Sequence, residues 1–116
     1  MAKIYTNFTN FSDTDLLVKG ETIIASMRGN AYFTGPLPPI ADVKAALDAF
    51  NSALQNVSAS NKDAMIIKNK ARATVETFLS NLGLYIQFES MGDERALQSS
   101  GYELLARRSS MPVLIR

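Results

Sequence analysis

The sequence of 116 residues contains no cysteine, no histidine and no tryptophan. Without cysteine there is no disulfide framework, no zinc–thiolate site and no thiol nucleophile. Without histidine the chain lacks the commonest general base and the commonest transition-metal ligand of proteins. These two absences exclude most familiar catalytic centres. We therefore expect a protein that is not an enzyme and that uses no cofactor or metal.

Long apolar runs and an excess of one charge are also missing. No segment reaches the roughly 20 apolar residues of a membrane-spanning helix, and the N-terminus lacks the apolar core of a signal peptide. The 12 basic and 11 acidic residues give a net charge of +1, so nothing attracts the chain generally to nucleic acid or to a membrane. We expect synthesis in the cytoplasm without a signal peptide and no membrane insertion, while assembly into a virion or another extracellular particle stays open.

What is present favours one all-α domain. Hydrophobic residues make up 47% of the chain, which is typical of a globular protein with a packed core. Apolar residues recur at steps of three and four, the period of helices. The pattern predicts a small bundle over residues 12–105, preceded by an extended aromatic arm at 1–11 and followed by a tail or linker at 106–116. Its helices are expected at residues 13–28, 41–57 and 62–91, with a short fourth helix at 93–99.

The longest predicted helix, residues 62–91, carries most of the large apolar side chains. One buried stripe is expected to contain Ile67, Ala71, Val75, Phe78, Leu82 and Tyr85. Ile66, Leu79, Ile86 and Phe88 widen the apolar surface beyond one face, so several partner elements should cover it. The helix at 41–57 has an apolar seam, and only residues 58–61 separate it from the long helix. These two helices are therefore predicted to form an antiparallel hairpin.

Single residues mark the start and the close contacts of the helices. Ser12 is a good N-cap for the first helix, and Asp13 and Asp15 suit the positive end of its dipole. Gly20 lies in the middle of this helix, where glycine costs about 1 kcal/mol, which indicates close contact with another backbone. Gly83 is predicted to be a second point of close approach.

The segments outside the helices carry aromatic and apolar residues. The arm contains Tyr5, Phe8 and Phe11, and it either lies across its own bundle, which we favour, or docks on a neighbouring protein. Residues 29–39 form a crossover with three prolines and two glycines, in which Tyr32 and Phe33 are expected to insert into the end of the bundle. Packing is favoured over a ligand pocket as the reason for their presence. The tail is either a linker or an arm that pairs with something else.

A basic cluster at residues 62–72 is the strongest charge feature. It contains Lys62, Lys68, Lys70 and Arg72, and Arg72 can pair with Glu76 one helical turn away. The cluster could contact phosphates, but it lacks interleaved stacking aromatics and is offset by acidic residues. We favour a solvated helix face.

Five segments together resemble a known family. They are MRGN at 27–30, YFTGPLPP at 32–39, ADVKAALDAF at 41–50, KNKARATVETFLSNLGLYIQ at 68–87 and GDERALQSSGYEL at 92–104. In this order they resemble the uncharacterised N-terminal helical domain of Bacteroidetes-type and phage-associated proteins that often carry a downstream fibronectin type III module. The resemblance implies an all-α bundle with a proline-rich crossover. It also implies a non-enzymatic module in a surface, secreted or phage-associated context.

These observations predict a non-catalytic structural or interaction module. It would be a component or adaptor of a larger assembly, such as a phage particle, a contractile apparatus or a cell-surface complex. Its partners would be proteins, among them other copies of itself as a homo-oligomer. The alternative is a small nucleic-acid-associated protein that uses the basic cluster, which we consider the weaker hypothesis. The candidate interaction residues are Tyr5, Phe8, Phe11, Tyr32, Phe33, Lys68, Arg72, Arg107, Arg108, Val113, Leu114 and Ile115.

Overall fold

A computed structural model describes residues 2–57 and 62–105 of the chain. Within these ranges it contains four helices: α1 (Asp13–Met27), α2 (Ile40–Gln55), α3 (Lys62–Ser90) and α4 (Glu94–Ser99). The described residues include no strand, and their one β-bridge is the antiparallel pairing of Ile4 with Leu104. The predicted all-α bundle is confirmed, and each helix ends within two residues of the predicted position.

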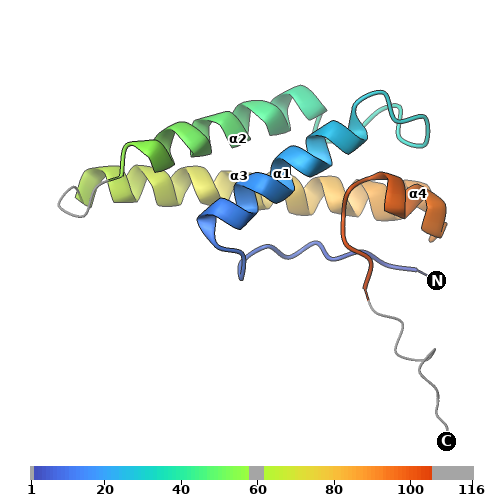
Figure 1. Ribbon diagram of the computed structural model, residues 1–116. Helices are drawn as coiled ribbons and strands as arrows, with labels where there is room; N and C mark the ends of the chain where they lie inside the picture. Colours follow the sequence, from blue (N-terminus) through green and yellow to red (C-terminus); the bar gives the residue numbers. More distant parts are fainter. Residues whose placement is uncertain (1, 58–61, 106–116) are drawn as a thin grey trace, which may run out of the picture.

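The long helix α3 is the element against which the others are arranged (Figure 1). Helix α2 runs antiparallel along it, which confirms the predicted hairpin, and α1 crosses obliquely over both. Helix α4 follows α3 after a tight turn at Gly92 and packs beside its C-terminal end. The core between these elements is continuous and includes Leu16, Ile23, Ile24, Met27, Val43, Leu47, Phe50, Val75, Leu79, Leu82, Ile86 and Leu97.

Helix α1 begins where the sequence indicates, but its close contact with α2 differs from the prediction. The Ser12 hydroxyl accepts a hydrogen bond from the Asp15 N–H at 3.1 Å, which satisfies one of the free N–H groups at the helix start. Gly20 does mark a close approach, since a Cβ there would lie 2.8 Å from Leu47 Cδ1 of α2. The neighbour is therefore a side chain, and the prediction of a backbone contact is wrong. Leu47 fills the space that the missing Cβ leaves.

The buried face of α3 begins later than predicted. Val75, Leu79, Leu82 and Ile86 are buried, whereas Ile67 is exposed. The prediction that Ile67 starts the buried stripe is wrong. Since the first residue of α1 lies beside Lys68 and Arg72, α1 covers α3 only from that turn onward.

The N-terminal arm lies across its own bundle, as favoured. Ala2, Ile4 and Phe8 are buried in the common core. The Tyr5 N–H donates to the Glu103 carbonyl at 2.9 Å, and the Leu105 N–H donates to the Lys3 carbonyl at 2.8 Å. The arm therefore pairs with the segment that follows α4, and the two cover the same side of α3 (Figure 1).

Two side chains fix this arrangement on α3. The Gln87 amide accepts from the Ile4 N–H at 3.0 Å and donates to the Ala2 carbonyl at 2.8 Å. The buried Tyr102 hydroxyl donates to the Leu79 carbonyl, and burial raises the pKa of this phenol. Gly83 lies below both segments, because a Cβ there would come within 2.7 Å of Thr6 and 3.1 Å of Tyr102. The second predicted close approach is confirmed.

Candidate functional site

The outer face of α3, turned away from the buried residues, exposes large apolar side chains near both ends of the helix. Ile66 is 57% exposed, Leu84 61% and Phe88 78%, and Met91, directly after the helix, is 79% exposed. Ile66, Leu84 and Phe88 belong to a line of exposed residues that we call the outer stripe. Its members follow one another at steps of three and four residues, so they lie along one side of the helix. They are Ile66, Lys70, Ala73, Thr77, Asn81, Leu84 and Phe88, all of them exposed.

Isolated apolar side chains are common on protein surfaces, whereas neighbouring apolar side chains that form a patch mark contact sites. Leu84 and Phe88, one helical turn apart, are such neighbours. Burying one Leu or Phe side chain contributes about 1.5 to 3 kcal/mol. The prediction that Ile66 and Phe88 are covered is wrong within the described part of the chain. Other faces of α3 are covered by α1, α2 and the arm, but nothing in the described ranges covers the outer face.

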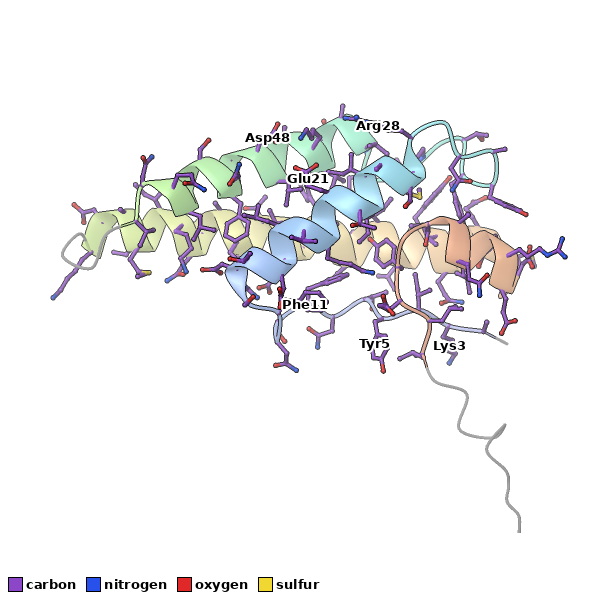
Figure 2. All side chains as sticks on the ribbon, viewed as in Figure 1. Lys3, Tyr5, Phe11, Glu21, Arg28 and Asp48 are labelled. Atoms are coloured by element: carbon purple, nitrogen blue, oxygen red, sulfur yellow. The ribbon has the colours of Figure 1, made fainter. Side chains whose placement is uncertain are left out.

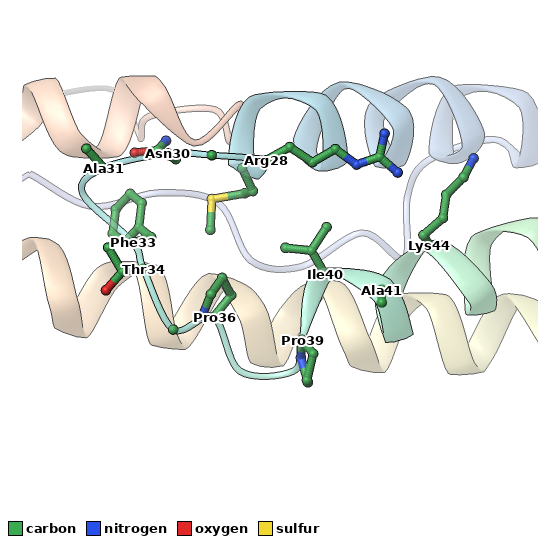
Figure 3. A pocket seen from close by; sticks show the side chains of 13 residues that line it. Arg28, Asn30, Ala31, Phe33, Thr34, Pro36, Pro39, Ile40, Ala41 and Lys44 are labelled. Atoms are coloured by element: carbon green, nitrogen blue, oxygen red, sulfur yellow. The ribbon is translucent and has the colours of Figure 1, made fainter.

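A second surface is the groove beside the crossover. It has a volume of about 880 Å³ and lies between the C-terminal end of α1 and the N-terminal end of α2 (Figure 3). Ile40 and Pro36 line it, and Arg28 and Lys44 bring positive charge to it. Lys44 already pairs with Asp48 at 3.1 Å and with Glu21 at 3.3 Å. These two carboxylates raise the pKa of Lys44, so its charge is matched inside the protein.

The crossover packs largely as predicted, with one correction. Phe33 is buried and lies 6.1 Å, centroid to centroid, from the ring of Tyr85 on α3. Tyr32, however, is 51% exposed, so the prediction that both rings insert is wrong. The Asn30 side chain accepts from the Tyr32 N–H at 2.9 Å and donates to the Ser99 carbonyl at 3.1 Å. This turn directs consecutive residues to different sides, and only one ring faces the bundle.

The basic cluster is split between the surface and an internal network. Asp13 of α1 accepts from Lys68 at 2.9 Å and from Arg72 at 2.7 Å, and Arg72 also pairs with Glu76 at 2.6 Å. The side chains of Lys68 and Arg72 are only 12% and 15% exposed. The i,i+4 pair is confirmed, but the prediction of a solvated face is wrong for these two cations. They are also poorly placed to contact phosphate.

Arg72 additionally binds the arm. Its guanidinium donates to the backbone carbonyls of Phe8 and Phe11, at 3.2 and 2.5 Å. Burial raises the pKa of Asp13, but hydrogen bonds from Lys68 and Arg72 and the charges of these cations outweigh that effect. The pKa of Asp13 therefore lies below its ordinary value, and the carboxylate stays ionised beside its two partners.

The remaining predicted interaction residues fall into three groups. Phe8 is buried and Phe11 is partly buried against the core, with their rings 5.3 Å apart. Tyr5 projects away from the helices (Figure 2). The tail residues lie outside the described ranges: Arg107, Arg108, Val113, Leu114 and Ile115.

The described ranges contain neither a metal-binding cluster nor a membrane-spanning helix. Residues 2–57 and 62–105 contain no group of three or more acidic side chains placed to hold a metal ion. None of the helices described is long and apolar enough to cross a membrane.

Comparisons with protein-family models, with curated proteins and with solved structures each found no match to this chain. The resemblance to the N-terminal helical domain therefore stays a prediction.

Proposed function

We propose that this protein is a non-catalytic interaction module that joins a larger assembly through the outer face of α3. The observation that carries this proposal is the outer stripe, in which Ile66, Leu84 and Phe88 are more than half exposed on one side of a rigid helix. The helix is held from its other sides by α1, α2 and the arm. It therefore presents these side chains in a fixed arrangement and needs no rearrangement to bind.

The composition of the stripe suits a protein partner. Leu84 and Phe88 lie one turn apart and form an apolar anchor, with the polar or charged Asn81 and Glu89 beside them. An apolar anchor bordered by polar side chains is common in protein–protein contacts. The kind of assembly, whether a phage particle, a contractile apparatus or a cell-surface complex, follows from the identity of the partner.

The proposal is tested by photo-crosslinking in the source organism. Phe88 is replaced by a photo-reactive phenylalanine derivative, and a matched chain carries the same group at Val18, which is exposed on α1. We expect one adduct of discrete mass from position 88 and none from position 18. Leu84→Lys in the position-88 chain should abolish the adduct, because an ammonium group in the contact would be desolvated without a partner.

Equal labelling from both positions would contradict the proposal, and so would an adduct that survives Leu84→Lys. Mass spectrometry of the adduct identifies the partner residue, whether it belongs to another protein or to a second copy.

A further inference from the structure

We propose that the partner of the outer stripe is a second copy of this chain, bound antiparallel along α3 with a two-fold axis at Thr77. This inference rests on the proposed function and specifies its partner. It requires that the stripe complement itself when one copy is turned end for end. The spacing, the side-chain sizes and the charges of the stripe each bear on that requirement.

The spacing of the stripe is symmetric about Thr77. Ile66 precedes Thr77 by 11 residues and Phe88 follows it by 11. Eleven residues are close to three full helical turns, so all three residues lie on nearly one line along α3. In an antiparallel pair centred on Thr77, Ile66 of each copy faces Phe88 of the other. Because the contact is two-fold symmetric, this apolar pair forms twice.

The side chains between these anchors can be accommodated across the axis. At the centre, Thr77 faces its own copy and the small Ala73 leaves room for the longer Asn81. Seven residues on either side of the axis lie Lys70 and Leu84, which face each other across the pair. Leu84 can pack on the methylene groups of Lys70 while the ammonium group reaches water.

The charges favour the antiparallel direction over the parallel one. The Ile66 end carries Lys62, Asp63 and Lys70, a net positive charge, and the Phe88 end carries Glu89. Lys62, Lys70 and Glu89 form no ion pair within the described ranges. An antiparallel pair brings these unlike ends together and opposes the two helix dipoles. A parallel pair would instead place each lysine of one chain beside the same lysine of the other chain, where the two positive charges repel.

Cysteine crosslinking tests the axis directly, because the chain has no cysteine of its own. We expect Thr77→Cys to give a disulfide-linked dimer on mild oxidation. Ala73→Cys and Asn81→Cys lie four residues to either side of the axis, so each alone should stay monomeric on a denaturing gel. An equal mixture of these two variants should crosslink, since each faces the other across the axis. Val18→Cys on α1 serves as the control that should not crosslink.

Light scattering over a range of concentrations supplies the independent measurement. The full chain should approach twice its mass of 12.7 kDa. Phe88→Lys should remain at the monomer mass with unchanged helical circular dichroism, because it removes the apolar anchor and places a positive charge against the positive end of the other copy, whereas Val18→Lys should still dimerise. A monomeric wild-type chain at all concentrations would overturn the inference, as would self-crosslinking of Ala73→Cys, which indicates a parallel pair. If the wild-type chain is monomeric but position 88 still photo-crosslinks to a different protein, the self-pairing fails and the proposed function stands.

Discussion

Asp13 is the residue that joins the start of α1 to α3. It lies in the first turn of α1 and accepts hydrogen bonds from Lys68 and Arg72, while Arg72 reaches on to the arm at Phe8 and Phe11. One carboxylate thus pairs with two partly buried cations, of which Arg72 also pairs with Glu76, and it lies at the positive end of a helix dipole. Removing the charge of Asp13 should weaken the contacts among α1, α3 and the arm.

We predict that Asp13→Asn lowers the free energy of unfolding by about 1 to 3 kcal/mol at neutral pH, because charged hydrogen bonds of this kind contribute that much. This loss of stability should become smaller as the pH falls. The folded pKa of Asp13 is lowered, so its contribution is complete above the unfolded value of about 3.9 and is lost as the pH falls toward the folded value. Urea unfolding at several pH values should therefore show wild-type and variant converging in acid.

Asp15→Asn is the matched control for this prediction. Asp15 lies in the same helical turn and is exposed, and it makes no ion pair in the described ranges. Its substitution should change stability by less than about 0.5 kcal/mol. An equal effect of the two substitutions would show that the helix dipole, rather than the ion pairs, accounts for the role of Asp13.

For single charged residues, the sequence predicts only ion-pair partners that are close along the chain. The pair of Arg72 with Glu76 is predictable because four residues separate them on one helix. The pair of Arg72 with Asp13 joins residues 59 positions apart and depends on where α1 crosses α3. Spacing along the chain contains no information about that crossing, so the sequence alone indicates a solvated face.

Helix α3 shows what periodicity predicts for an element and what it leaves undetermined. Its helical state, its length and its antiparallel pairing with α2 follow from apolar spacing and a short connection. Its apolar residues, however, occupy more than one face. Val75 and Leu82 have the same side-chain chemistry as Ile66 and Leu84, and nothing in the sequence says which face the rest of the chain covers. The outer stripe could therefore be detected from sequence only as an excess of apolar residues.

On the covered side of α3, Gly83 leaves too little room for a larger side chain. Gly83→Ala would place a Cβ 2.7 Å from Thr6 and 3.1 Å from Tyr102. We expect a net loss of roughly 1 to 2 kcal/mol, since overpacking exceeds the gain in helix propensity. Gly35→Ala is the control, because its Cβ would meet nothing within 4 Å. Chemical denaturation of both variants checks the prediction, and a more stable Gly83→Ala chain would contradict it.

On the scale of the whole molecule, the arm is part of the fold. Residues from the two ends of the described chain meet on α3, where Ile4 pairs with Leu104 and both Phe8 and Tyr102 are buried. The Phe8 and Tyr102 rings lie 5.9 Å apart in an edge-to-face arrangement. Deleting the arm to test for partner binding would therefore remove core residues and unfold or loosen the bundle.

We predict that Ile4→Ala destabilises the entire bundle, whereas Tyr5→Ala does not. Ile4 is buried in the common core, so its truncation should lower the free energy of unfolding by about 2 to 5 kcal/mol. Tyr5 is exposed, so its truncation should lower the free energy of unfolding by less than about 1 kcal/mol. Both variants keep the backbone hydrogen bond between Tyr5 and Glu103. Unfolding in urea, followed by helical circular dichroism and by the near-ultraviolet signal of the tyrosines, should give coincident curves shifted together in Ile4→Ala. If the tyrosine signal is lost at lower urea while the helices persist, the arm is a separately unfolding unit and does not belong to the cooperative core.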